Sequence, residues 1–110
     1  MAINWNKFTI KSQEAFEAAQ NIASEYGHQA LDNEHLLAAL IDQKDGVVRP
    51  ILAKIGASPE TVLAKTREKL ENMPQVSGGG VGQVYITPRL NKTLETAQKE
   101  AERLKDEYVS

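Results

Sequence analysis

The sequence predicts an all-α fold of short packed helices in a single domain of 110 residues. Small and apolar residues recur at spacings of three and four, which is the period of an amphipathic helix. Helix-start and helix-stop residues bracket these segments, and two of the starts place a Ser or Thr before proline. The chain shows no alternation of strand and helix patterns, which argues against a parallel sheet with crossover helices.

The first two helices are predicted from their caps. Thr9 caps a helix that stops at Gly27, because glycine readily adopts the left-handed conformation found after a helix end. Its inward stripe consists of Ala15, Phe16, Ala19, Ile22, Ala23 and Tyr26. Asp32 caps the second helix. The residues of that helix expected to face inward are Leu36, Leu37, Leu40 and Ile41.

Three further helices follow. A short one is predicted around residues 48–55, and Ser58 caps the next, which runs to about Asn72. A cap followed by proline at residues 87–88 starts the last helix. The apolar positions of that helix are Leu90, Leu94, Ala97, Ala101 and Leu104. Residues 83–86 alternate weakly and form a short extended segment without an obvious strand partner.

An internal duplication is indicated when the chain is compared with itself at a shift of 78 residues (87 − 9). The pattern Glu-x-Ala-Gln-x-x-Ala then occurs at residues 17–23 and again at 95–101. We therefore predict a first repeat at about 9–72, a glycine-rich inter-repeat loop at 74–86 and the start of a second repeat at 87–110. Because Ser110 falls opposite Asp32, the second repeat is expected to be truncated after its first helix, in a fragment of a longer protein.

The string from Gly27 to Leu40 resembles the Clp N-terminal (Clp repeat) domain family. Its Gly-His, followed by Glu-His-Leu-Leu-x-Ala-Leu, is the most recognisable part of the likeness, which covers about Thr9 to Ser110. The Pro-Gln-Val at residues 74–76, followed by glycines, resembles the ClpB-type protein disaggregases more than the protease-associated Clp ATPases. The resemblance implies an all-helical double Clp repeat.

The resemblance also implies a function. The chain is expected to be the substrate-recognition N-terminal domain of an ATP-dependent ClpB-type chaperone, which captures unfolded or aggregated polypeptides for disaggregation and refolding. The full-length parent is expected to be a cytoplasmic homohexameric AAA+ ATPase that uses ATP and magnesium and cooperates with a DnaK-type chaperone system. The alternative is an adaptor-docking N-terminal domain of a Clp protease ATPase subunit. The fragment itself is expected to be no enzyme and to bind no cofactor.

The run of four glycines within residues 78–82 invites comparison with phosphate-binding loops. A P-loop requires Lys and then Ser or Thr after its last glycine, but Gln83 and Val84 occupy those places. A dinucleotide fingerprint requires a preceding strand and a following helix, whereas here a helix and a proline precede the glycines. The run is therefore predicted to be a flexible inter-repeat loop.

Other chemistries are also disfavoured. The chain has no cysteine and two histidines, and a closed zinc site needs four donors, so no metal site is expected. His35 is instead interpreted as a packing or capping partner in the first turn after Asp32. A net charge of −2 argues against nucleic acid as a partner. No apolar segment approaches the roughly 18 residues of a membrane span.

The candidate site is a cleft between the two repeats that accepts apolar peptides. By resemblance, Thr9 and Asp106 match positions linked to substrate handling, although Thr9 is also a helix cap and Asp106 is equally suited to bridging two helices. Leu90 and Leu94 are candidate groove residues, with burial in the core as the alternative. Without its partner helices the last helix is expected to dock on the first repeat, to self-associate or swap, or to fray.

Overall fold

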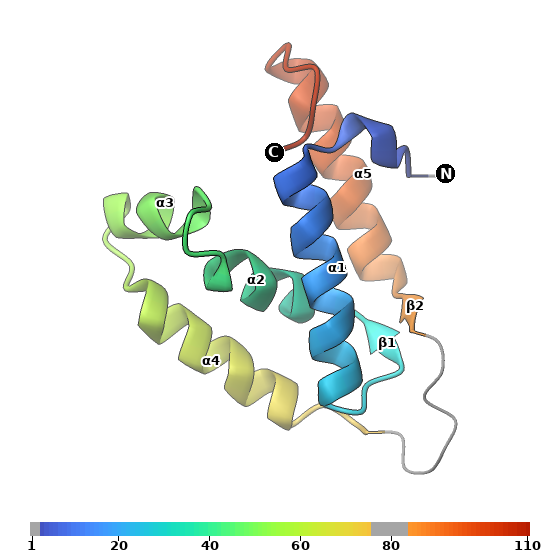
Figure 1. The fold of residues 1–110 in the computed structure, drawn as a ribbon, viewed down its shortest axis with the longest axis vertical. Helices are drawn as coiled ribbons and strands as arrows, with labels where there is room; N and C mark the ends of the chain where they lie inside the picture. The colour runs from blue at the N-terminus through green and yellow to red at the C-terminus, as the bar shows by residue number, and fades with distance from the viewer. Residues whose placement is uncertain (1–2, 76–83) are drawn as a thin grey trace.

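The computed structural model describes residues 3–75 and 84–110 (Figure 1). The helices are the short 3₁₀ helix η1 (Trp5–Lys7), α1 (Ile10–Glu25), α2 (Asn33–Asp42), α3 (Val48–Lys54), α4 (Pro59–Glu71) and α5 (Pro88–Arg103). Two-residue strands, β1 (Ala30–Leu31) and β2 (Tyr85–Ile86), complete the fold. The all-α prediction is confirmed. Residues 76–83, which include the predicted glycine-rich loop's glycines, lie outside the described residues.

Side-chain caps begin the helices where the sequence places them. The hydroxyl of Thr9 accepts a hydrogen bond from the backbone N–H of Ser12 at 3.2 Å, and that of Thr87 accepts one from Leu90 at 3.1 Å. Ser58 caps α4 in the same way, with proline at the first helical position. Each hydroxyl satisfies a backbone donor that has no partner within its helix. None of the helices in the described part of the chain is long and apolar enough to cross a membrane.

The extended segment before α5 does have a strand partner. β2 pairs in parallel with β1, with Leu31 opposite Ile86, and the N–H of Thr87 donates to the carbonyl of Leu31 at 3.0 Å. This partner lies more than 50 residues away in the sequence (86 − 31) and becomes a neighbour only because α5 docks beside the end of α1. Local sequence patterns carry no information about such a pairing.

A second parallel bridge repeats this pairing at the other end of α1 and α5. Phe8 pairs with Val109, and the N–H of Thr9 donates to the carbonyl of Val109 at 2.9 Å. The shift of 78 residues relates Phe8 to Ile86 and Val109 to Leu31 (86 − 8 and 109 − 31). Each extended segment before a long helix therefore pairs with the segment after the other long helix, as expected for two copies of one unit.

The ends of α1 and α5 obey the same relation. The N–H of His28 donates to Ala23 and the N–H of Asp106 donates to Ala101, each at 2.8 Å. The residue before each has positive φ, 73° at Gly27 and 61° at Lys105. Lys105 thus adopts at the end of α5 the left-handed conformation that glycine provides at the end of α1. Asp106 is the structural counterpart of His28.

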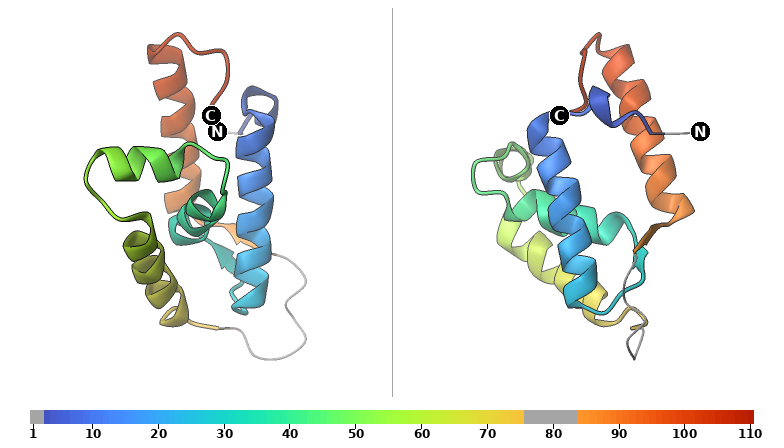
Figure 2. Two further views of the ribbon diagram at one scale, coloured as in Figure 1. Left: turned by 60° about the vertical axis from the view of Figure 1, so that its left-hand side comes forward. Right: turned by 45° about the vertical axis from the view of Figure 1, so that its right-hand side comes forward.

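The core lies where α1, α2 and α5 meet. Small residues of α1, namely Ala15, Ala19 and Ala23, have no exposed surface and allow α2 to pack closely. Leu90 and Leu94 of α5 join Ala19 and Ala23 in one buried cluster. A second cluster, Ala38, Ile41, Leu63 and Leu70, holds α4 on the other side of α2 (Figure 2). The expectation that the last helix docks on the first repeat is therefore confirmed.

Candidate functional site

An apolar groove runs over α2 where α4 and α5 flank it. Its floor consists of Leu36, Leu37 and Leu40 of α2 and Val62 of α4, and its volume is about 570 Å³. The remaining lining residues are Asn33, Glu34, Lys65, Thr66, Lys69 and Thr93. Apolar clefts of this size accept side chains of a peptide while a few polar groups fix its orientation.

A smaller apolar hollow of about 200 Å³ continues this groove, because Leu36, Leu40 and Thr93 line both. Aromatic and aliphatic residues line the rest of it: Trp5, Phe8, Phe16, Leu94, Ala97 and Val109. Trp5 is the single tryptophan of the chain, and its ring lies 4.5 Å from that of Phe16. The intrinsic fluorescence of Trp5 therefore reports on this end of the groove.

The structure separates the four residues that the sequence suggested for the site. Leu94 lines the smaller hollow, whereas Leu90 is fully buried and belongs to the core. Thr9 is the cap of α1, and its hydroxyl also donates to the hydroxyl of Ser12 at 3.1 Å. Asp106 is exposed and lines a separate hollow of about 180 Å³ together with Lys7 and Glu102. Only Leu94 therefore lies at the groove.

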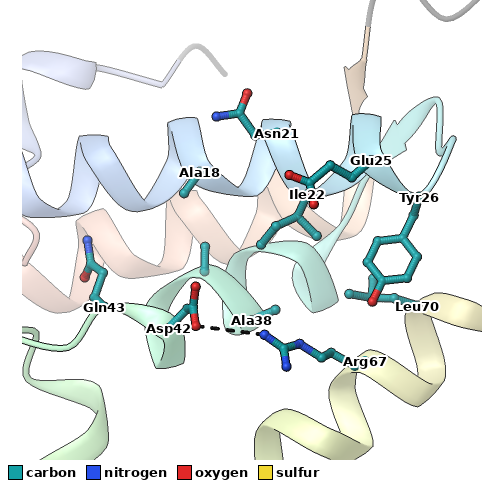
Figure 3. Close-up of a pocket in the computed structure, with 11 residues that line it drawn as sticks. Ala18, Asn21, Ile22, Glu25, Tyr26, Ala38, Asp42, Gln43, Arg67 and Leu70 are labelled. Atoms are coloured by element: carbon teal, nitrogen blue, oxygen red, sulfur yellow. Dashed lines mark ion pairs between the residues drawn. The ribbon is translucent and has the colours of Figure 1, made fainter.

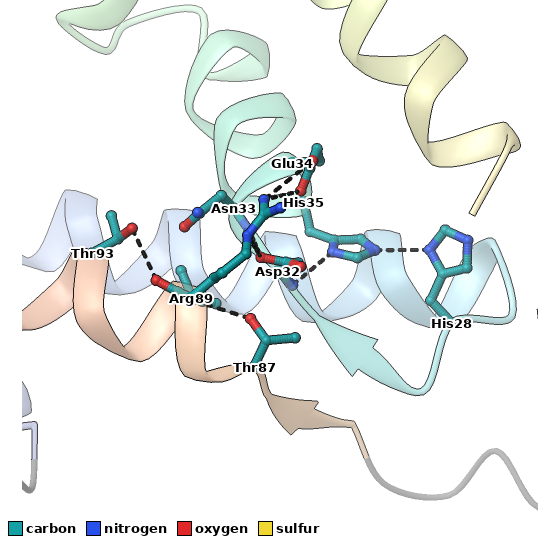
Figure 4. Close-up of polar contacts among 9 residues, drawn as sticks. His28, Asp32, Asn33, Glu34, His35, Thr87, Arg89 and Thr93 are labelled. Carbon is teal, nitrogen blue, oxygen red and sulfur yellow. Dashed lines mark hydrogen bonds and ion pairs between the residues drawn. The ribbon is translucent and has the colours of Figure 1, made fainter. Parts of the chain in front are cut away.

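An ion-pair cluster ties the start of α5 to the start of α2 beside the groove (Figure 4). The guanidinium of Arg89 lies 3.3 Å from the Asp32 carboxylate. It also contacts both carboxylate oxygens of Glu34, at 3.2 Å and 3.3 Å. Because Asp32 and Glu34 are largely covered while Arg89 remains exposed, the cluster is partly screened by water. It neutralises Glu34, the carboxylate that lines the groove.

Two buried histidines connect α2 to the loop after α1 (Figure 4). The Nδ1 atom of His35 accepts a hydrogen bond from the backbone N–H of Asp32 at 2.9 Å, which completes a capping box. Nε2 of His35 then donates to Nδ1 of His28 at 2.8 Å. These bonds require neutral rings, and burial lowers the pKa of both histidines. The capping interpretation of His35 is confirmed.

With this geometry in hand, the chain was compared with known proteins. Residues 7–110 match the Clp repeat (R) N-terminal domain family. The chain belongs to this family. The Clp repeat domain is 47% identical over 106 residues to the chaperone protein ClpB of Nitratidesulfovibrio vulgaris, covering 94% of the chain and 12% of that protein. The chain thus spans about an eighth of the length of this relative.

Solved structures share the fold of the Clp repeat domain. The N-domain of ClpV from Vibrio cholerae superposes with a TM-score of 0.81 at 21% identity, covering 94% of this chain and 61% of that one. A complex of a ClpV N-domain with a VipB peptide gives a TM-score of 0.74 at 22% identity, covering 94% of this chain and 62% of that one. The predicted Clp repeat identity is therefore confirmed.

The Clp repeat domain has a second groove, between α1 and α4 over α2 (Figure 3). Its volume is about 530 Å³, and small residues such as Ala18 and Ala38 form part of its lining. Charged groups stand around it, including Glu25 and an Asp42–Arg67 ion pair of 3.9 Å. An apolar segment entering here desolvates these charges, which is unfavourable, so the groove over Leu36, Leu37 and Leu40 is the better candidate.

The groove floor was assigned incorrectly from the sequence. Leu36, Leu37 and Leu40 were all expected to face inward, but Leu37 is 37% exposed and the other two are only half-buried. The signal was present in the spacing. Apolar residues at 36, 37, 40 and 41 cover a wider arc of α2 than one buried stripe needs, and Ala38 and Ala39 are buried as well.

We expect Arg89→Ala to lower the free energy of unfolding by about 0.5–1 kcal/mol, because it removes a partly screened ion-pair cluster. Urea unfolding followed by circular dichroism measures the change. A double-mutant cycle with Glu34→Gln isolates the pair, and Arg103→Ala, which removes an exposed pair with Glu100, is the matched control. A coupling of zero between Arg89 and Glu34 would show that the cluster contributes nothing to stability.

Proposed function

We propose that this Clp repeat domain is the substrate-recognition N-terminal domain of an ATP-dependent ClpB-type chaperone. In this function it captures unfolded or aggregated polypeptides and passes them on for disaggregation and refolding. The observation that carries the proposal is the apolar groove, whose floor exposes leucine side chains without a partner of fixed shape among the described residues. The likeness to ClpB of Nitratidesulfovibrio vulgaris supports it.

The proposal extends to the parent protein. The match is to the Clp repeat domain and not to an ATPase module, so ATP hydrolysis with magnesium is assigned to other domains of the parent. A cytoplasmic homohexamer working with a DnaK-type chaperone system completes the proposal. The absence of cysteine suits a reducing compartment.

Titration with a permanently unfolded protein, reduced and carboxymethylated α-lactalbumin, tests the groove. We expect a saturable change in the fluorescence of Trp5, which lines one end of the groove. Leu37→Asp is expected to weaken binding by about 10-fold or more, because a bound apolar segment would bury an unpaired carboxylate. Leu37 is 37% exposed, so the substitution leaves the core intact.

Leu104→Asp is the matched control, since Leu104 is 59% exposed and lies on α5 outside the groove. We expect this variant to bind like the unmodified chain. Equal affinities of the Leu37 and Leu104 variants for the unfolded protein would rule the groove out as the binding site.

The alternative function is docking of an adaptor for a Clp protease ATPase. The structure of a ClpV N-domain with a VipB peptide favours it, because that relative of the fold holds a defined peptide. The two functions differ in their partners. Binding that increases with the apolar content of unfolded chains supports substrate capture, whereas tight binding to one folded protein, independent of apolar content, supports adaptor docking.

A further inference from the structure

Two lysines of α4 stand along the wall of the apolar groove. Lys65 and Lys69 both line it and lie four residues apart, which places them on the same face of the helix. Both are exposed. Within the described ranges 3–75 and 84–110, neither ammonium group has an ion-pair or hydrogen-bond partner. Two cations therefore face the groove without counter-charges.

The carboxylates nearby do not neutralise these lysines. Glu34 lines the groove, but both of its oxygens are held by Arg89 at 3.2 Å and 3.3 Å. Glu60, Glu68 and Glu71 share α4 with the lysines and are absent from the groove lining. Glu60 is paired with Arg49.

The other cation of α4 belongs to a different surface. Arg67 lies between the two lysines in the sequence, but it lines the second groove and pairs with Asp42 at 3.9 Å. The helix therefore divides its cations between two surfaces. The groove over α2 carries an excess of positive charge although the whole chain has a net charge of −2.

This charge lies beside an apolar floor, where less water screens an approaching ion than at an open surface. A segment that combines apolar residues with nearby carboxylates meets both features, because its apolar side chains cover Leu36, Leu37 and Leu40 and its carboxylates reach Lys65 and Lys69. A segment flanked by Lys or Arg brings like charges together, which is unfavourable.

We propose that the groove selects apolar polypeptide segments flanked by Asp or Glu, with the carboxylates placed against Lys65 and Lys69. The selection rests on the proposed function, because it names the class of polypeptide that the same groove captures. The contribution of the two lysines is electrostatic, so it decreases as the salt concentration rises.

Peptides with one apolar core and either Glu, Ser or Lys on both sides test the selection by fluorescence anisotropy. We expect the Glu-flanked peptide to bind about 3-fold to 10-fold more tightly than the Lys-flanked one at low salt. The difference should shrink at high salt. The double variant Lys65→Gln, Lys69→Gln should bind all three peptides alike, because glutamine keeps most of the aliphatic stem and removes the charge.

Lys92→Gln with Lys99→Gln is the matched control, since both residues lie on α5 and neither lines the groove. It should keep the preference for Glu. Equal binding of the three peptides to the unmodified chain would overturn the charge selection and leave the proposed function standing. Failure of every peptide to bind would overturn both.

A second copy of the chain is the other occupant to test. Sedimentation at increasing concentration should show a monomer, because the proposal leaves the groove free for substrate. Self-association that Leu37→Asp abolishes would overturn the proposal by showing that the groove is an interface between copies.

Discussion

Replacing Leu90 with alanine is expected to lower the free energy of unfolding by about 2–5 kcal/mol. Leu90 has no exposed surface and lies in the cluster that joins α5 to Phe8, Ala19 and Leu31. Its truncation removes apolar burial and leaves a cavity that rigid neighbours fill only in part. Urea unfolding, followed by far-ultraviolet circular dichroism and by the fluorescence of Trp5, measures the loss.

Leu104→Ala provides the comparison on the same helix. Leu104 is 59% exposed, so its truncation should change stability by no more than about 0.5 kcal/mol. Hydrogen exchange should also show faster exchange of the α5 amides in the Leu90 variant than in the Leu104 variant, since Leu90 anchors the helix. Similar stability losses in the two variants would contradict the docking of α5 seen in the structure.

Acidification from pH 8 to pH 5 is expected to destabilise the domain through His28 and His35. Histidine in an unfolded chain has a pKa of about 6.5, and burial lowers the pKa of both rings in the fold. The unfolded state therefore binds more protons between the folded pKa and about 6.5, so stability rises with pH in that window. It is fully present above the window and is lost as the pH falls.

The slope is limited to about 1.4 kcal/mol per pH unit for each histidine. Protonation is costly for a structural reason. A proton on Nδ1 of His35 removes the acceptor for the Asp32 N–H, and a proton on Nδ1 of His28 points at the N–H of His35. Urea unfolding at successive pH values measures the effect.

The variant His35→Gln separates this pair from other acid effects. Glutamine at this position can still accept from the Asp32 N–H and complete the capping box, but it does not titrate. We expect a shallower loss of stability between pH 8 and pH 5. Asp45→Asn is the control, because Lys11 holds the pKa of Asp45 below 3.8, outside this range. Identical slopes for His35→Gln and the unmodified chain would exclude the histidine pair as the cause.

The helices of this domain are readable from the sequence because their determinants are local. Thr9, Ser58 and Thr87 each cap the helix that follows them, and each accepts a hydrogen bond from a residue three positions later. The duplication is also readable, since it requires only that one pattern recur at a fixed shift. The structure adds the two parallel bridges, related by the same shift, which no local pattern contains.

The groove was predicted less well than the helices. A cleft for apolar peptides was expected, but Leu90 lies in the core and Asp106 lies at a separate hollow. Helical periodicity assigns Leu37 to the apolar face of α2, and it cannot say how far α4 and α5 cover that face. The exposed edge that remains depends on how these helices pack.

The sequence by itself determined the all-α class, the helix starts, the family and the capping role of His35, because these depend on residues close together in the chain. Only the tertiary structure decided which leucines remain accessible, which strand pairs with residues 85–86 and which lysines face the groove. The physical reason is that exposure and charge complementarity belong to surfaces assembled from distant segments. Those surfaces exist only after α4 and α5 have packed against α2.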